Sequence, residues 1–184
     1  MTVIQLIISD YKKYKKYGSN ALVILFLTQG FWATFQYRIA HFLYVKVTLQ
    51  PFRFLFMGLM FFWQKMIEII TGISIPASAQ LGNSFYIAHF GGIILNSETK
   101  IGNNCNISQG VTVGVSGLGN RRGVPIIGNN VYIGANAVLA GKIVIGDNVL
   151  IGACSFVGSD VEQNNVVLGV PAVVVSDKSS KGYI

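Results

Sequence analysis

Residues 127–162 read IGNNVY, IGANAV, LAGKIV, IGDNVL, IGACSF and VGSDVE, which are six consecutive units of six residues. Each unit begins with an aliphatic residue, usually followed by Gly or Ala, and has a small or β-branched residue four places further on. The same phase recurs upstream between Leu81 and Val113. A fixed internal period of this kind is the sequence signature of a repeat architecture.

Six residues suffice for one short strand and a corner, so three units would close a triangular coil, and the coils would stack into a parallel β-helix. We expect the first and fifth residues of each unit to point into this narrow prism. Glycine and asparagine at positions such as 128–130 suit tight corners and positive φ angles. The pattern predicts a rigid scaffold with little room inside for a ligand.

Two interruptions break the period. Leu95 follows Ile87 by eight residues instead of six, so two extra residues bulge within 88–92. Ile127 follows Val113 by fourteen residues, so a loop over 114–126 is extruded from the prism. Insertions in a repeat protein map to loops on one face, often the binding face. We therefore expect the functional residues in these two segments.

Residues 1–72 have no such period and are rich in Leu, Phe and Ile. They hold eight basic and two acidic residues, so they carry +6 of the net charge of +7. This balance predicts an anionic partner surface. Because the basic residues alternate with strongly apolar runs and no nucleic-acid motif is present, we expect an anionic membrane surface and no nucleic acid. The basic residues are Lys12, Lys13, Lys15, Lys16, Arg38, Lys46, Arg53 and Lys65, and the acids are Asp10 and Glu68.

The uncharged stretch 17–37 is long enough in principle to span a membrane, but its polar content favours two or three helices that lie in the interface. The apolar run 54–63 is too short to span. No small-residue cleavage site follows, so the expected location is cytoplasmic, at the inner face of the bacterial cytoplasmic membrane. The alternative is a helical cap that packs on trimer partners.

The cysteines and histidines offer no spacing typical of a metal site, so we expect no metal. Cys105 and Cys154 lie far apart in the sequence and are expected to be buried free thiols in a reducing compartment. His41 lies in an apolar helical stretch and is expected to be a packing residue. His89, within the first interruption, is the better candidate for chemistry.

The repeats, the segment IAHFGGIILNSETKIG (87–102), SQGVTVG (108–114) and the closing GVPA (169–172) resemble the serine acetyltransferase branch of the hexapeptide acyltransferases. The resemblance implies a mainly β fold: a left-handed parallel β-helix over 73–175, preceded by the apolar α-helical section 1–72 and followed by a tail, 176–184. It also implies a homotrimer that uses acetyl-CoA as co-substrate to acetylate a hydroxyl.

Acetyl transfer to an alcohol requires a base that removes the hydroxyl proton. An imidazole can accept a proton near neutral pH, and His89 stands where the family has its catalytic histidine. Glu98, which matches a family Glu-Thr dipeptide, is either the partner of His89 or a solvated corner charge. Arg121 and Arg122 either meet an anionic acceptor or a CoA phosphate, or are solvated loop charges.

The family places the pantetheine arm of acetyl-CoA in the groove between neighbouring prisms, where backbone groups hold it. By position, this implies contacts at Gly114, at Gly134 and Ala135, and at Gly152 and Ala153. Small side chains there would let a thin arm approach the backbone. The alternative is that these residues only form corners of the coils.

Three family positions are changed in this chain. The family has an acid before the first coil, another before the histidine, and an Arg-His pair at the end of the extruded loop. Here those places hold Ser74, Ala88, and Gly123 with Val124. A zwitterionic amino acid without charged partners is costly to bury, so the sequence disfavours serine as acceptor, and Ser74 is expected to contact another acceptor.

Together with the short apolar N-terminal section and the absence of the family's C-terminal tail, these changes look more like the capsule and exopolysaccharide O-acetyltransferases of the colanic-acid type. Those enzymes act on lipid-linked sugars. The sequence therefore predicts a membrane-associated O-acetyltransferase with a saccharide acceptor from a surface polysaccharide. The alternatives are a serine O-acetyltransferase and, in another class, a non-catalytic trimeric scaffold that docks on a membrane.

Overall fold

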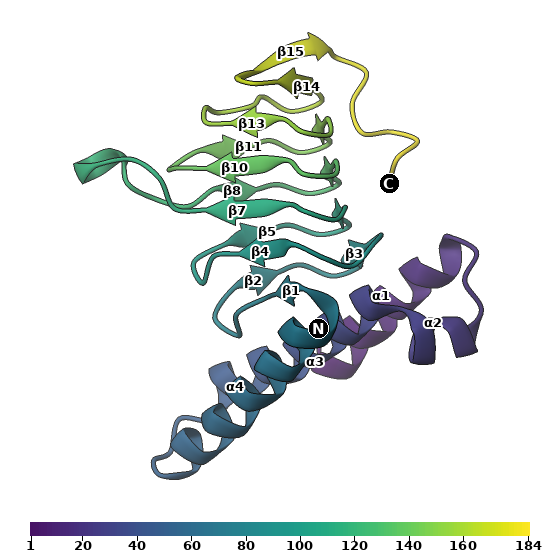
Figure 1. Ribbon diagram of the computed structural model, residues 1–184, viewed down its shortest axis with the longest axis vertical. Coiled ribbons are helices and arrows are strands. Elements are labelled where there is room, and N and C mark those ends of the chain that lie inside the picture. The colour runs from purple at the N-terminus through teal and green to yellow at the C-terminus, as the bar shows by residue number, and fades with distance from the viewer.

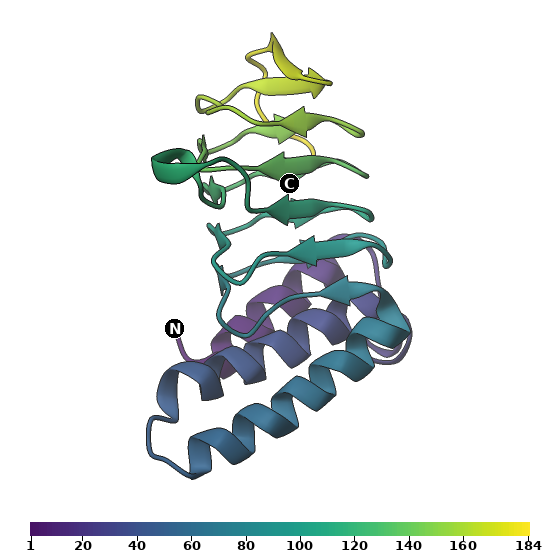
Figure 2. The same cartoon turned by 60° about the vertical axis from the view of Figure 1, so that its left-hand side comes forward.

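The computed structural model describes residues 1–184. Its N-terminal part forms four α-helices, where two or three were expected, and they lie at one end of a column of strands (Figure 1). Helices α3 and α4 run side by side below the lowest coil of the column (Figure 2). The helices are α1 (Val3–Lys16), α2 (Ala21–Leu27), α3 (Gln29–Lys46) and α4 (Phe52–Thr71).

The column is a triangular prism whose three faces are parallel sheets, here named A, B and C. The strands follow the order A, B, C along the chain and stack in the same order in space, as a β-helix requires. Sheet A contains β1 (Ile73–Ser74), β4 (Ile93–Leu95), β7 (Thr112–Gly114), β10 (Val138–Ala140) and β13 (Phe156–Val157). Sheet B contains β2 (Gln80–Leu81), β5 (Lys100–Ile101), β8 (Ile126–Ile127) and β11 (Val144–Ile145). Sheet C contains β3 (Tyr86–Ile87), β6 (Asn106–Ile107), β9 (Tyr132–Ile133), β12 (Leu150–Ile151), β14 (Val166–Gly169) and the antiparallel β15 (Ala172–Ser176).

The interior of the prism is filled by the residues that the period selects. The leading aliphatic residues from Leu81 to Val157 are all buried, and Cys105, Val131 and Val149, at the fifth position of their units, are fully so. One continuous apolar core results. The predicted inward pattern is confirmed, because a strand of two or three residues can present only alternate side chains to the inside.

The corner between sheets B and C is held by a ladder of asparagines. Asn104, Asn130, Asn148 and Asn164 all adopt positive φ, between 55° and 65°. The amide nitrogen of each donates to the side-chain oxygen of the next, over 2.8 to 3.0 Å. Asparagine tolerates the left-handed conformation better than most residues, so the same side chain makes the turn and joins successive coils.

Polar side chains of the helices cover the open end of the first coil. The hydroxyl of Tyr37 accepts a hydrogen bond from the backbone nitrogen of Leu81 and donates one to the carbonyl of Ala79. The hydroxyl of Tyr14 accepts from the backbone nitrogen of Ile87 and donates to the carbonyl of the same residue. These contacts replace the missing neighbouring strand, whose absence would leave buried backbone groups unpaired. The helical section therefore caps the β-helix.

The uncharged stretch 17–37 is divided between two helices. The chain turns at Gly18 and again at Thr28, so the uncharged stretch 17–37 forms the short α2 and part of α3 instead of one span. The run 54–63 is instead part of the longer α4. This helix alone is long and apolar enough to cross a membrane by length and composition, and only 6 % of its apolar stretch is buried.

The two cysteines occupy different environments. Cys105 is buried in an inward slot, as predicted, and burial raises the pKa of its thiol to about 11. Cys154 is exposed, so the expectation that both are buried is wrong. Cys154 is the fourth residue of its repeat unit and turns a corner at φ 57°, which points its side chain outward.

Candidate active site

The segments between strands form the edges of the prism, and the candidate residues fall on two of them. The histidine edge joins sheet C to sheet A and comprises 88–92, 108–111, 134–137 and 152–155. The loop edge joins sheet A to sheet B and comprises 96–99, 115–125 and 141–143. Because sheet A separates these edges, residues on one are distant from residues on the other within a single chain.

His89 follows β3 and lies in the two-residue bulge on the histidine edge. Its side chain is exposed. Gly91 and Gly92 complete the bulge with φ angles of 97° and 67°, which side chains with a Cβ rarely adopt. A Cβ at Gly72, which ends α4, would lie 3.0 Å from the Cα of Gly91. The bulge therefore rests on the end of α4 and presents the imidazole outward.

The glycine and alanine pairs predicted to contact acetyl-CoA lie on the histidine edge, above His89. Ala153 is exposed, and Ala135 is half-buried. A Cβ at Gly134 would lie 2.6 Å from the backbone nitrogen of Ala153, so this glycine is required by the stacking of the coils. The side chains of these alanines are small, so little projects from the backbone along the edge. Gly114, in contrast, ends β7 at the beginning of the loop edge.

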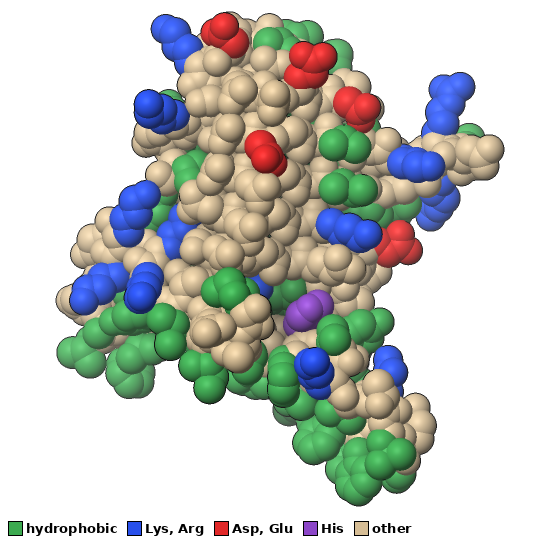
Figure 3. All heavy atoms as spheres, turned by 180° about the vertical axis from the view of Figure 1, so that it is seen from behind, with side chains coloured by type: hydrophobic (Ala, Val, Ile, Leu, Met, Phe, Trp, Pro, Cys, Tyr) green, Lys and Arg blue, Asp and Glu red, His purple; other side chains and the backbone are tan.

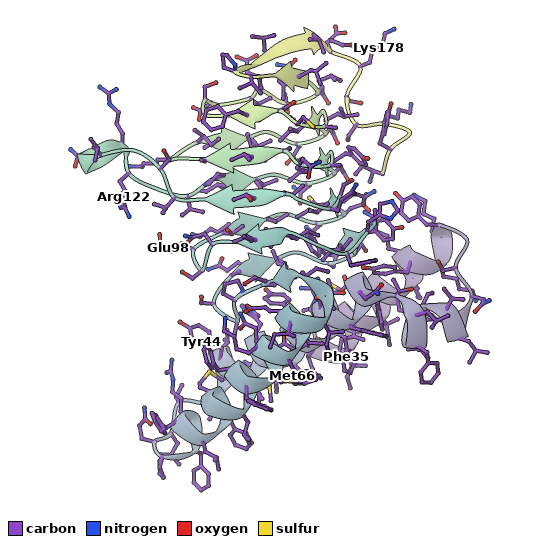
Figure 4. All side chains as sticks on the ribbon, in the orientation of Figure 1. Phe35, Tyr44, Met66, Glu98, Arg122 and Lys178 are labelled. Carbon is purple, nitrogen blue, oxygen red and sulfur yellow. The ribbon has the colours of Figure 1, made fainter.

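The loop edge carries a polar cleft of about 630 Å³. It brings together Glu98, from the turn after β4, and Arg122, from the extruded loop, with Lys100 and Lys142. Figure 4 shows the labelled side chains of Glu98 and Arg122 on the same side of the prism. An acid and three cations line one cleft, so it offers charges of both signs.

The extruded loop stands away from the prism, with a short 3-10 helix at Gly119–Arg121 (Figure 1). Of the two loop arginines, Arg122 lines the cleft and Arg121 does not. Lys100 and Lys142 also line the cleft, and neither was predicted as a site residue. Lys100 occupies the outward position of β5 that aligns with Ile126 of β8, so the repeat register contained the signal that it lies beside the end of the loop.

Glu98 and His89 lie on opposite sides of sheet A, and β4 separates them. Within one chain Glu98 is therefore not the group that orients His89. The acid that the structure places beside a predicted site residue is Glu68 of α4. The hydroxyl of Ser74 donates to Glu68 Oε1 over 2.7 Å, and Ser74 lies on β1, beside Ile94 of β4. A carboxylate thus stands beside the position at which the family has its first acid.

The charge on Glu68 is stabilised by its neighbours. Partial burial alone would raise the pKa of Glu68, but hydrogen bonds from Lys65, Ser74 and Gln64 hold it below its usual value. Glu68 is therefore ionised at neutral pH. Its place was not visible in the sequence, because α4 brings it to Ser74 only when the helix packs under the first coil.

The other histidine has a structural role. His41 Nδ1 lies 2.8 Å from the carbonyl oxygen of Ala77, so this nitrogen donates the hydrogen bond that ties α3 to the chain after β1. No three His, Cys, Asp or Glu side chains are grouped so that they could hold a metal ion.

Comparison with known proteins identifies the family. A family model described as bacterial transferase hexapeptide (six repeats) matches residues 125–159. The chain is 35 % identical over 156 residues to a serine acetyltransferase of Synechococcus elongatus, covering 85 % of this chain and 61 % of that protein. It is 33 % identical over 157 residues to a serine acetyltransferase of Helicobacter pylori, covering 85 % of this chain and 87 % of that protein. The chain belongs to the serine acetyltransferase family of hexapeptide acyltransferases.

Solved structures agree with this assignment. The chain matches the Neisseria gonorrhoeae serine acetyltransferase in complex with serine with a TM-score of 0.80 and 34 % identity, covering 95 % of this chain and 69 % of that chain. It matches a serine acetyltransferase in complex with CoA with a TM-score of 0.81 and 28 % identity, covering 95 % of this chain and 70 % of that chain. The predicted fold, a left-handed β-helix of hexapeptide repeats after a helical section, is confirmed.

These comparisons also correct the predicted acceptor. The prediction of a surface-polysaccharide sugar is wrong, because the matching relatives and structures are serine acetyltransferases. The resemblance to capsule O-acetyltransferases has no support for the same reason. Ser74, Ala88 and Gly123 do lack the charges that the family has at these positions, but charged groups need not come from the same positions in the sequence. The fold supplies Glu68 and the charged cleft from other parts of the chain. The predicted membership of an acyltransferase family is confirmed.

Proposed function

We propose that this protein is an acetyl-CoA-dependent serine O-acetyltransferase. One observation carries the proposal: the chain shares the fold of a serine acetyltransferase that was solved with serine, at 34 % identity over 95 % of its length. The exposed His89, in a bulge at the position of the family's catalytic histidine, supports it. The chain spans 61 % of the Synechococcus enzyme, so the activity, substrates and partners are part of the proposal.

His89 acts as general base. Its imidazole removes the proton from the serine hydroxyl as the hydroxyl oxygen attacks the thioester carbonyl carbon. The carbon–sulfur bond then breaks, the acetyl group remains on serine, and the CoA thiolate takes the proton from the imidazolium. The exposed side chain of His89 is accessible to both substrates. The small residues along the same edge, Ala135 and Ala153, leave space for the pantetheine arm beside the histidine.

The cleft on the loop edge holds the charged groups of the acceptor. Free serine carries an ammonium and a carboxylate, and binding it away from water requires a partner for each. Glu98 suits the ammonium, and Arg122 suits the carboxylate because a guanidinium binds carboxylates with two parallel hydrogen bonds. Lys100 and Lys142 add positive charge for the carboxylate or for a CoA phosphate.

The active unit is a homotrimer. His89 and the cleft lie on different edges of one prism, so a single chain cannot offer both to the same substrate molecule. Three prisms packed side by side would place the histidine edge of one subunit against the loop edge of the next. Closed cyclic assembly of identical chains is the common way to build such repeated contacts. The separation of the two edges is the observation that supports the trimer.

The proposal is tested by the release of CoA from acetyl-CoA with L-serine as acceptor. We expect His89→Ala to lower kcat/KM at least about 100-fold, because general-base catalysis contributes roughly that much. The matched control is His41→Gln, which keeps a donor for the Ala77 carbonyl and should stay within about threefold of the wild type. No release with L-serine by the wild-type protein, or full activity in His89→Ala, would overturn the proposal.

The shared site is tested by subunit mixing. Chains that carry His89→Ala and chains that carry both Glu98→Gln and Arg122→Ala are each impaired by themselves. When the two are co-expressed, mixed trimers contain contacts in which an intact histidine edge faces an intact loop edge. Partial recovery of CoA release is expected. Failure to recover activity in mixed trimers of confirmed composition would contradict a site built from two chains.

A further inference from the structure

Helix α4 turns its polar side chains toward the protein and its hydrophobic side chains toward solvent. Its polar residues Arg53, Gln64, Glu68 and Thr71 are half-buried or buried. Its exposed residues, apart from Lys65 and Gly58, are all hydrophobic. A surface helix normally turns its apolar stripe to the core and its charges to water. The exposed hydrophobic residues are Phe52, Phe54, Leu55, Phe56, Leu59, Phe61, Phe62, Met66, Ile69 and Ile70.

Helix α2 adds to the same apolar surface. Leu22, Leu25, Phe26 and Leu27 of α2 are exposed, with Leu22 and Leu27 at 69 % and 68 %. Together with the exposed residues of α4 they form what we call the apolar face. Figure 3 shows hydrophobic side chains gathered along the helical end of the molecule, with Lys and Arg side chains bordering them. Exposed apolar surface on this scale marks a binding site.

The charges around the apolar face are positive. The two acids of the helical section are both engaged within the chain, Asp10 with Arg38 and Glu68 with Lys65 and Ser74. Lys12, Lys15, Lys16 and Lys46 are exposed. The surface of the helical section is therefore apolar at its centre and cationic at its border, which complements an anionic lipid surface.

We infer that the apolar face docks on an anionic lipid bilayer, with α4 lying in the plane of the interface. The half-buried face of α4 packs along α3, and α3 holds Tyr37 and Arg38 against the first coil. Helix α4 therefore remains attached to the protein while its outer face enters the lipid. The phenylalanines and the basic border are the residues that favour the interfacial region of a bilayer.

A bilayer fits this face better than a second copy of the chain. Two copies packed by their apolar faces would bring two sets of exposed lysines together, and no exposed acid of the helical section would offset them. Anionic headgroups attract each nearby lysine. The helices lie at the end of the prism opposite β15 (Figure 2), so docking leaves most of the β-helix clear of the membrane.

The test is co-sedimentation of the full-length protein with vesicles of phosphatidylcholine, with and without phosphatidylglycerol. We expect binding to the anionic vesicles, weakened by added salt. The triple variant Phe54→Ser, Phe62→Ser, Ile69→Ser should bind at least about tenfold more weakly, because each change removes exposed apolar surface from the contact. The matched control is Val170→Ser, Val173→Ser, Val175→Ser, which alters three exposed hydrophobic residues at the end of the β-helix far from the helical section and should bind like the wild type.

The membrane inference can fail while the proposed function holds, because the two are measured separately. CoA release from soluble substrates should be the same in both triple variants and in the wild type. Equal vesicle binding by the α4 variant and the control variant would overturn the inference. So would a wild-type protein that ignores both kinds of vesicle, or an α4 variant that loses its oligomeric state while its vesicle binding stays unchanged. Equal binding to neutral and anionic vesicles would overturn the role of the basic border.

Discussion

The guanidinium of Arg38 in α3 binds the carboxylate of Asp10 in α1 at two points, with Nε–Oδ2 at 2.8 Å and Nη2–Oδ1 at 3.1 Å. Both side chains are about 1 % exposed. Arg38 Nη1 also donates to the carbonyl of Leu81 over 2.8 Å, and Asp10 accepts from the backbone of Phe85. This buried pair therefore joins two helices to the first coil of the β-helix.

Replacement of Arg38 should separate the helical cap from the prism. Arg38→Ala leaves Asp10 buried without its cation and two carbonyls without their donor, and removing one partner of a buried ion pair costs about 3 to 5 kcal/mol. We expect a loss of this size in the free energy of unfolding, measured with urea. The control is Arg53→Ala, whose guanidinium stacks on Tyr44 and should cost less than about 1 kcal/mol. Equal losses would show that the pair does not carry this junction.

Substitution of two glycines, Gly134 and Gly114, should distinguish a role in the stacking of coils from a role in binding acetyl-CoA. Gly134→Ala should lower the free energy of unfolding by about 1 to 3 kcal/mol, because its Cβ would lie 2.6 Å from the nitrogen of Ala153 and overpacking costs that much. The nearest atom to a Cβ at Gly114 is 3.8 Å away. Gly114→Ala should therefore leave stability unchanged and raise KM for acetyl-CoA. Unfolding and steady-state kinetics measure both, and similar destabilisation in the two variants would contradict the distinction.

The adjacent loop arginines should differ in function. Arg122 lines the charged cleft and Arg121 does not. Loss of one charge-assisted hydrogen bond worth about 1.4 kcal/mol corresponds to a tenfold change in affinity. We expect Arg122→Ala to raise KM for L-serine about tenfold, with Arg121→Ala changing it less than about twofold. Equal effects of the two changes on KM would mean that the cleft is not the acceptor site.

Lys13 should make stability depend on pH. Its ammonium is buried and donates to Asn104 Oδ1 over 2.7 Å, and burial lowers the pKa of Lys13 from 10.5 to about 8. Between these two values the unfolded chain binds more protons than the folded chain, so the contribution of Lys13 to the free energy of unfolding rises with pH from about 8 to 10.5.

The comparison with Lys13→Met isolates this contribution. Urea unfolding across the same pH interval should give a wild-type stability that increases relative to that of the variant as the pH rises. Groups that do not interact with Lys13 are common to both proteins and cancel in the difference. The Cys105 thiol does interact with Lys13, so both proteins carry Cys105→Ala in this comparison. Parallel pH profiles for the two proteins would contradict the role given to the buried ammonium.

Much of the fold was predictable because the repeat is local. The inward slots, the bulge at His89 and the extruded loop all follow from counting residues between Ile87, Leu95, Val113 and Ile127. Each unit interacts with its neighbours above and below, so a six-residue phase determines which side chains are buried. The helical section has no such phase. There the prediction of two or three helices was wrong, because the structure has four.

The sequence alone determined the β-helix, its core and the family, because each depends on a pattern of adjacent residues. The tertiary structure alone decided which charged groups meet. Glu68 reaches Ser74 because α4 packs beneath β1, and Glu98 joins Arg122 because the loop edge stacks residues from successive coils. Such contacts depend on how elements pack in three dimensions, and the spacing of residues in the chain does not reveal them. The sequence shows that the family's acids are replaced at positions 74 and 88. It does not show that Glu68 and the charged residues of the cleft are brought together by the fold.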